Sequence, residues 1–432
     1  MKNCQIDLDR PELAINGGKP LRNANWIGNY TIGKEEKKAA LEAIKTGYLS
    51  KFEGSFTPDP PFSFTGGPFV LRLESDWANY YGMNNAVSMN SATSCLFATW
   101  GALNIGFGDE VIIPAITMTA CAVGPLLYGA IPVFADVDSD TGCIDPDSIE
   151  SLISERTKAV LVVHLYGYVA DMERIQKICK EKNISIIEDC AQAHGAKYKG
   201  KYIGTFSDIS IFSLNVNKTI QVGEGGVCLT NDADLAFRLQ LIRNHGEAVV
   251  GPANYEHITN IMGFNYRLTE IQGAMAIEQL KKLDGLTKQR LEMVNYLNEK
   301  LEKYKCLNIF KPAPDSFCVY YQYKLSLNEE ELGISGPELI KVLNAEGLYF
   351  FSGYQPLYFQ PVYQQRKMFK YGYPWAAPEN RKINVSYKAG CCPVAESLQS
   401  STLTNEHIRP PNNLSDMEDI VMVFEKVLGK ND

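Results

Sequence analysis

The chain has 432 residues, of which 45% are hydrophobic and 21% are charged, as in ordinary globular proteins of two or three domains. A net charge of −8 argues against nonspecific binding to nucleic acid or to an anionic membrane, because both need an excess of Lys and Arg. The first residues contain no apolar core of signal-peptide length, and no apolar run is long enough to span a bilayer. We therefore expect a cytoplasmic protein.

The eleven cysteines are an odd number and include no C-x2-C pair. Several lie in apolar runs, such as Cys228 between Val227 and Leu229, where cysteine acts as a small hydrophobe in a reducing compartment. Cys190 and His194 are close enough in sequence to be metal ligands, but no second pair completes a zinc pattern. The sequence therefore predicts no metal site.

The chain begins with an irregular N-terminal segment, residues 1–33, which a predicted helix over 35–46 follows. Residues 52–68 form a long loop rich in Phe, Pro and Gly that cannot be regular structure. Such a loop is either a flexible surface insertion or an arm that covers an active site. The four phenylalanines within it favour a segment that packs.

From residue 85 to residue 230, apolar runs alternate with helical patterns. The seven predicted strands are residues 86–89, 111–114, 132–137, 159–165, 184–188, 207–213 and 227–230. Nearly continuous apolar strands separated by helices predict an α/β fold with a mostly parallel seven-stranded sheet, covered on both faces. Ligands of such sheets bind at the carboxyl ends of the strands. We assign this large domain to residues 34–285.

The pattern changes in the C-terminal part of the chain. Residues 268–283 predict an apolar-rich helix, which continues after Asp284 and Gly285 as a charged segment over 286–304. Residues 319–325 then alternate like a strand, 336–347 are helical, and 416–428 form an amphipathic helix. We therefore predict a long connecting helix and a smaller C-terminal α/β domain over residues 286–432.

Lys218 lies between a predicted strand end and the glycines at 223, 225 and 226. On its own it would be a solvated loop lysine. Upstream, however, another strand ends in Glu188 and Asp189. A lysine and an acid at strand ends are the pair that pyridoxal 5'-phosphate (PLP) chemistry requires. The lysine forms the Schiff base, and the carboxylate keeps the pyridine nitrogen protonated.

Five motifs in order carry a family resemblance. They are Ser-Ala-Thr-Ser at 91–94, Glu-Asp-Cys-Ala-Gln-Ala-His-Gly at 188–195, Phe-Ser-x4-Lys at 212–218, Gly-Glu-Gly-Gly at 223–226 and Asn-Tyr-Arg at 265–267. This order resembles the DegT/DnrJ/EryC1/StrS family, PLP-dependent aminotransferases that act on keto sugars and keto-cyclitols. The resemblance extends from residue 13 to residue 396. It implies the type I, aspartate aminotransferase-like PLP fold.

The resemblance also implies roles for particular residues. Lys218 would hold the cofactor and then move protons as a general acid and base. Asp189 would contact the pyridine nitrogen, whereas Glu188 faces the opposite way in an alternating strand. Gln192 would hydrogen-bond the phenolic oxygen of PLP. The residues that match phosphate-binding positions of the family are Thr93, Ser94 and Ser213, with Ala92 where glycine is frequent.

Three further residues carry less specific expectations. His164 follows a strand and is either a catalytic group near the same pocket or a satisfied strand-end histidine. Met118 stands where many family members have an aromatic residue stacked on the pyridine ring, and a thioether can replace part of that contact. Arg243 is either an anchor for a donor carboxylate or substrate phosphate, or part of a surface salt bridge.

Asn265 matches a family residue that reaches the partner's PLP phosphate, so the resemblance implies a homodimer with shared active sites. The implied reaction moves an amino group from glutamate or glutamine to a keto sugar or keto-cyclitol. The absence of a basic cluster from the 52–68 loop favours an uncharged acceptor. A lysine at 218 favours transamination over the dehydratases of the family, which have histidine there. A PLP-dependent dehydratase or lyase, and a non-catalytic regulatory member of the family, are the alternatives.

Overall fold

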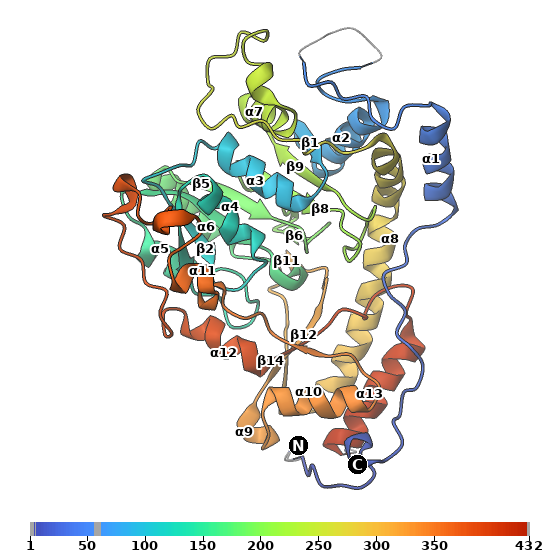
Figure 1. Cartoon of the computed structure of the whole chain (residues 1–432). Helices are drawn as coiled ribbons and strands as arrows, with labels where there is room; N and C mark the ends of the chain where they lie inside the picture. The colour runs from blue at the N-terminus through green and yellow to red at the C-terminus, as the bar shows by residue number, and fades with distance from the viewer. Residues whose placement is uncertain (1–3, 5, 56–61, 430–432) are drawn as a thin grey trace.

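The apolar runs of the N-terminal half form one sheet, because strands that are apolar on both faces must be covered on both. The computed structural model describes residues 4, 6–55 and 62–429. The strands of the sheet are β1 (Asn85–Met89), β2 (Glu110–Pro114), β3 (Ile131–Ala135), β4 (Thr157–Val163), β5 (Ser185–Asp189), β8 (Ile209–Ser213) and β9 (Gly226–Thr230). The prediction of a seven-stranded α/β sheet is confirmed (Figure 1).

The strand order is β1-β9-β8-β5-β4-β2-β3. Strand β9 is antiparallel to both of its neighbours, and every other pair is parallel. All strands except β9 therefore end at the same edge of the sheet. Among the residues brought to this edge are His164, Asp189 and Ser213, at the ends of β4, β5 and β8. This is the edge where parallel sheets bind ligands.

Polar side chains begin several helices of this larger part. Ser91, Asp145, Asp171 and Asp232 each accept a hydrogen bond from a backbone N–H of the first turn. The helices are α1 (Lys34–Lys45), α2 (Pro68–Tyr81), α3 (Ala92–Ala102), α4 (Ala120–Leu127), α5 (Pro146–Leu152), α6 (Met172–Lys182) and α7 (Ala233–Arg243). Helix α3 matters most below, since it begins directly after β1 at the ligand-binding edge.

One continuous helix, α8 (Glu270–Leu301), connects the two parts of the molecule (Figure 1). Thr269 and Gln272 form a capping box at its start. The helix runs through Asp284 and Gly285 without a break, so the predicted continuation into the charged segment is confirmed. A glycine inside a helix costs only about 1 kcal/mol, and α8 packs against α1, α2 and α13 (Leu414–Leu428). The predicted domain boundary after residue 285 thus lies inside a helix.

The C-terminal part contains an antiparallel sheet in the order β10-β12-β14-β13. Its strands are β10 (Leu307–Ile309), β12 (Tyr323–Leu327), β13 (Phe351–Ser352) and β14 (Thr402–Asn405). Its other helices are α9 (Glu329–Leu332), α10 (Gly336–Ala345), α11 (Pro361–Gln364) and α12 (Pro393–Ser401). A third, small sheet joins β6 (Lys197–Tyr198), β7 (Lys201–Tyr202) and β11 (Ser316–Phe317).

The strand predicted from residue 319 begins only at Tyr323. The residues before it bind the larger part instead, because Val319 and Gln322 donate their backbone N–H groups to the carbonyls of Gly167 and Tyr166. This segment brings the C-terminal part against the ligand-binding edge of the large sheet.

The described part of the Phe-rich loop packs only in part, since Phe62 is exposed. Phe52 and Phe64 are buried, and residues 56–61 of the predicted loop lie outside the described residues. Arg243 is fully buried beneath this loop, with its guanidinium 4.7 Å from the Phe52 ring centroid. It donates to Glu74 at 2.6 Å and to the Ser88 carbonyl at 3.0 Å. Both expectations for Arg243, a substrate anchor and a surface salt bridge, are wrong, since long-range contacts bury it in an internal ion pair.

The cysteines are not all isolated hydrophobes. Cys4 and Cys306 form a disulfide that ties the N-terminal segment to the chain after α8. The cysteines described as free are buried with the exception of Cys391. Within residues 4, 6–55 and 62–429, none of the helices combines the length and the apolarity that a membrane crossing demands.

Candidate active site

A cavity of about 370 Å³ lies between the carboxyl edge of the large sheet and the C-terminal part. Its lining comprises Ser91, Ala92, Thr93, Leu96, Met118, Ala120, Asp189, Ala191, Gln192, Ser213, Asn215, Asn217, Lys218, Glu224, Tyr321, Gln322, Tyr354 and Glu406. We call one group of these residues the strand-end wall: Asp189, Gln192, Ser213 and Lys218. We call a second group the C-terminal wall: Tyr321, Gln322, Tyr354 and Glu406.

Lys218 follows β8 in a tight turn, in which its N–H donates to the Asn215 carbonyl at 2.9 Å. Its side chain is half-buried, and its Nζ lies 4.6 Å from the centroid of the Tyr321 ring. Burial lowers the pKa of Lys218, and this effect is opposed by Tyr354 and by the carboxylates of Asp189 and Glu406. A lowered pKa makes the neutral amine, which is the nucleophilic and basic form, more abundant at neutral pH.

Two buried arginines bind the residues on either side of Lys218, one through a side-chain hydroxyl and one through a backbone carbonyl. Arg290 Nη1 donates to the Thr219 hydroxyl at 2.9 Å, and Arg409 Nη1 donates to the Asn217 carbonyl at 3.0 Å. Burial, together with the charge of Arg409, lowers the pKa of Arg290 to about 9. The lysine loop is therefore fixed by side chains from α8 and from the segment after β14.

Asp189 ends β5, and its carboxylate is buried at the cavity. Oδ1 accepts the Ala191 N–H at 2.9 Å, and Oδ2 accepts the Cys121 thiol at 3.3 Å. Burial raises the pKa of Asp189, and these hydrogen bonds and the charge of Lys218 oppose the rise. A cationic ring nitrogen is the kind of partner that this buried carboxylate would favour.

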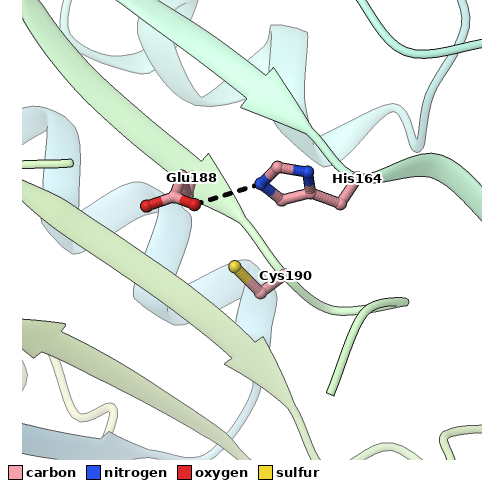
Figure 2. A group of neighbouring side chains, drawn as sticks. All are labelled: His164, Glu188 and Cys190. Carbon is pink, nitrogen blue, oxygen red and sulfur yellow. Dashed lines mark hydrogen bonds and ion pairs between the residues drawn. The ribbon is translucent and has the colours of Figure 1, made fainter. Parts of the chain in front are cut away.

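Glu188 points away from the cavity, as strand alternation predicts. It accepts hydrogen bonds from the backbone N–H groups of Gly204 and Phe206 and from the Ser207 hydroxyl. It also pairs with His164 Nε2 at 3.1 Å (Figure 2). Glu188 is thus occupied on both oxygens and does not compete with Asp189.

His164 is fully buried and is absent from the cavity lining. Its Nδ1 accepts the Ala170 N–H at 3.3 Å, which leaves the ring proton on Nε2 for Glu188. Of the two expectations for His164, these contacts favour the satisfied strand-end histidine. We therefore propose that His164 positions the ends of β4 and β5 rather than taking part in proton transfer.

Cys190 completes a cluster with His164 and Glu188, in which one ligand atom from each residue lies within 4.8 Å of the others (Figure 2). Burial, with the negative charges of Glu188 and Asp189, raises the pKa of the Cys190 thiol. A metal would need a thiolate and free lone pairs. The lone pairs of Glu188 and His164 are already used by their hydrogen-bond partners. We interpret the His164–Glu188 pair as part of a hydrogen-bonded network, with the Cys190 thiol beside it.

Gln192 is held from two sides. Its Oε1 accepts the backbone N–H of Tyr166 at 2.6 Å, and its Nε2 donates to the Tyr354 hydroxyl at 3.2 Å. Tyr166 has a φ of 59°, a strained value for a bulky residue. The Gln192 amide therefore faces the cavity in one orientation, and Tyr354 ties the C-terminal wall to the strand-end wall.

The N-terminus of α3 supplies anion-binding groups to the cavity. Ser91 caps the helix by accepting the Ser94 N–H at 3.0 Å, and its carbonyl accepts the Cys95 N–H at 3.1 Å. The preceding N–H groups of the first turn, those of Ala92 and Thr93, have no hydrogen bond among the described residues. Such N–H groups, with the positive end of the helix dipole, suit a phosphate.

The predicted phosphate-binding hydroxyls are placed differently from one another. Thr93 is exposed and lines the cavity, and Ser213 lines it while accepting the Asn215 N–H at 3.2 Å. Ser94 is buried outside the lining, where its hydroxyl donates to Asn90 at 2.6 Å. Its expected contact with a phosphate is therefore not supported, because the capping network of α3 uses its hydroxyl.

Met118 lines the cavity and is 53% exposed, so its thioether is available to a ligand. Asn265 is exposed and does not line the cavity of its own chain. Its Oδ1 accepts a hydrogen bond from Arg267 Nε at 2.8 Å, and its carbonyl accepts one from Asn90 Nδ2 at 3.3 Å. Its predicted contact with a partner's site stays a prediction.

Several residues of the site escaped sequence reasoning. Cys121, Tyr321, Tyr354 and Glu406 lie in no motif quoted above, and three of them belong to the C-terminal wall. The alternation over 319–325 was the only signal near Tyr321. No signal in the sequence marks Tyr354 or Glu406, since tertiary contacts alone bring these residues to Lys218.

The residues of the cavity fit PLP by their chemistry. The site combines a half-buried lysine, a buried carboxylate and a fixed glutamine amide with free N–H groups at a helix start. Strand β9 also lies very close to the start of α3. A Cβ on Gly226 would lie 2.6 Å from the Ala92 nitrogen, so only glycine lets β9 pack against the start of α3.

Comparisons with known proteins agree with this site. Residues 62–379 match the DegT/DnrJ/EryC1/StrS aminotransferase family. The chain is 32% identical over 433 residues to an L-glutamine:2-deoxy-scyllo-inosose aminotransferase of Streptomyces kanamyceticus, covering 98% of each chain. It is 37% identical over 299 residues to GDP-perosamine synthase of Caulobacter vibrioides, covering 69% of this chain and 79% of that protein.

A solved structure shares the fold. DesV of S. venezuelae superimposes with a TM-score of 0.76 at 28% identity, covering 92% of this chain and 95% of that one. The predicted type I PLP-enzyme architecture is confirmed by this match.

Proposed function

The chain belongs to the DegT/DnrJ/EryC1/StrS family of PLP-dependent sugar and aminocyclitol aminotransferases, and from this premise we propose that it aminates a free keto-cyclitol with glutamine or glutamate as donor. The observation that carries the proposal is the presence of Lys218, Asp189 and the open N–H groups of α3 in one cavity. PLP, when bound, supplies an electron sink that stabilises the negative charge left when a substrate Cα loses a proton.

The residues of the strand-end wall would bind and orient the cofactor. Asp189 would hold a positive charge on the ring nitrogen, because its buried carboxylate lacks a cationic hydrogen-bond partner. Gln192, fixed by Tyr166 and Tyr354, would present its amide to the phenolic oxygen. Thr93, Ser213 and the first N–H groups of α3 would hold the phosphate.

Lys218 would carry the covalent attachment and then move the proton. Its lowered pKa favours a neutral Nζ, which could accept the proton that the substrate Cα loses and act afterwards as the acid that returns it. Arg290 and Arg409 would keep this amine in place through their hydrogen bonds to Thr219 and Asn217. Tyr321 would limit its motion, since Nζ lies 4.6 Å from the ring centroid.

Two observations favour a free cyclitol over a nucleotide-linked sugar. The cavity lining contains one basic side chain, Lys218, alongside three carboxylates, Asp189, Glu224 and Glu406. Such a lining disfavours a diphosphate near the reaction centre. The similarity to the inosose aminotransferase also covers 98% of each chain, whereas that to GDP-perosamine synthase covers 69% of this one.

We further propose a homodimer in which Asn265 serves the site of the partner subunit. Asn265 is exposed, is absent from the lining of its own cavity and is anchored through Asn90 to the strand that precedes α3. Each active site would then need two copies of the chain.

The proposed reaction is tested with the PLP-loaded protein, L-glutamine or L-glutamate and 2-deoxy-scyllo-inosose. We expect an amino-cyclitol and a 2-oxo acid in equal amounts, measured by mass spectrometry and a coupled assay. A dehydrated sugar product without 2-oxo acid would support the dehydratase alternative instead. Absence of turnover with every donor and keto acceptor would support a regulatory protein.

A further inference from the structure

Glu406 follows β14 and lines the same cavity as Lys218, although nothing in the reaction described above uses it. Its side chain is half-buried. Over residues 4, 6–55 and 62–429, no hydrogen bond or ion pair is made to its carboxylate. An ionised group that faces a cavity without a partner is free to meet a ligand.

The other charged groups of the cavity are already engaged. Asp189 is buried and holds the hydrogen bonds from Ala191 and Cys121. Glu224 accepts the Asn215 amide at 3.1 Å. Lys218 is the group that the reaction itself requires. Among the described residues, Glu406 is therefore the carboxylate of the cavity lining that has no hydrogen-bond or ion-pair partner.

The charge of Glu406 acts on the reaction centre. Burial lowers the pKa of Lys218 and also that of Arg409, and the negative charge of Glu406 opposes both effects. Among the described residues Arg409 forms no ion pair with Glu406, and its Nη1 donates to the Asn217 carbonyl instead. The negative charge of Glu406 thus extends to the part of the cavity that holds the amine.

A carboxylate in this position discriminates between substrates by charge and by hydrogen-bond type. It accepts hydrogen bonds from hydroxyl and amide N–H groups and repels other carboxylates and phosphates. Both half-reactions of an aminotransferase use one site, so the same group acts on the donor and on the acceptor.

We propose that Glu406 determines substrate specificity: its carboxylate accepts a hydrogen bond from the side-chain amide of glutamine in the donor half-reaction and from a ring hydroxyl of an unphosphorylated cyclitol in the acceptor half-reaction, and it repels glutamate and phosphorylated acceptors. This inference rests on the proposed function. It assigns glutamine as the donor.

The test compares Glu406→Gln with wild type and with Glu330→Gln, which removes the same charge from an exposed residue of α9 outside the cavity. Single-turnover spectroscopy of the PLP-loaded protein gives kcat/KM for L-glutamine and L-glutamate. We expect wild type to prefer glutamine by about tenfold or more, and Glu406→Gln to reduce that ratio by about tenfold, mainly through faster reaction with glutamate.

The acceptor half-reaction gives an independent readout. Wild type is expected to prefer 2-deoxy-scyllo-inosose over a phosphorylated keto-cyclitol, and Glu406→Gln to narrow that preference, while Glu330→Gln matches wild type in both assays. A wild type that prefers glutamate, or a donor ratio that Glu406→Gln leaves within about twofold, overturns the inference while amino transfer itself persists. A wild type that uses neither donor overturns the proposed function and this inference together.

Discussion

The strand-end wall and the C-terminal wall of the cavity are built in different ways. Asp189 and Ser213 end parallel strands of the large sheet, and Lys218 follows one of them within a few residues. Tyr354 and Glu406 instead come from irregular segments next to short antiparallel strands. We propose that the sheet carries the groups that any PLP reaction needs, and that the irregular segments carry groups that select the substrate. This difference predicts that substitutions in the two walls have different kinetic effects.

Lys218→Ala should have the largest effect, because it removes both the attachment point and the proton carrier. We expect kcat to fall by about 10³-fold or more with either donor. Lys201→Ala, at an exposed lysine of β7, is the matched control and should behave like wild type. Equal rates for Lys218→Ala and its control would remove Lys218 from the reaction.

Asp189→Asn should have the next largest effect on the rate. It keeps the shape of the side chain and removes the charge that favours a protonated ring nitrogen, so the donor half-reaction should slow by about 10²- to 10³-fold while PLP still binds. Stopped-flow absorbance measures the rate of this half-reaction with both donors. Both donors should slow to a similar extent, in contrast to Glu406→Gln. A near-normal rate would assign the role to another group.

The proposed contribution of Asn265 to the partner's site is tested by mixing two inactive variants. Lys218→Ala damages the site of its own chain, whereas Asn265→Asp would place a negative charge against the partner's phosphate. If Asn265 acts across a dimer interface, half of the sites in a mixed dimer are intact. After random mixing of equal amounts, about half of the dimers are mixed and each has one intact site. The mixture should then recover about a quarter of wild-type activity. No recovery, with mixed dimers demonstrated by mass spectrometry, would place Asn265 in its own site or outside catalysis.

The smallest expected effect is a shift in the titration of Lys218. Because burial lowers its pKa below the ordinary value of 10.5, the cofactor-free protein should react with an amine-directed reagent at lower pH than exposed lysines do. The neutral amine is the reactive form, so labelling increases as pH rises through that pKa. Glu406→Gln removes a negative charge that raises the pKa, so its midpoint should move to still lower pH. A midpoint at the ordinary value, or a shift in the opposite direction, would contradict the coupling of the two walls.

The strand-end wall was largely predictable from sequence, because each of its residues follows an apolar strand in a recognisable motif. The seven strands follow from nearly continuous apolar runs, and the opposite directions of Asp189 and Glu188 follow from strand alternation. For Ser94, the sequence did not reveal that the capping network of α3 competes for its hydroxyl. Arg243 was misjudged because its partner Glu74 is distant in sequence and invisible to local patterns.

The C-terminal wall was not predictable in the same way. Tyr321 lies in a segment that reads as a strand but is held by Tyr166 and Gly167 of the larger part. Tyr354 and Glu406 lie beside short strands with no periodic signal, and only the packing of the two parts brings them to Lys218.

The central claim is that Lys218 holds PLP in the cavity between the two walls. Borohydride reduction of the yellow PLP-loaded protein, followed by proteolysis and mass spectrometry, tests it most directly. The account predicts a reduced pyridoxyl adduct on the peptide that contains Lys218 and on no other lysine. An adduct on a different lysine, or a protein that takes up no PLP, would contradict it.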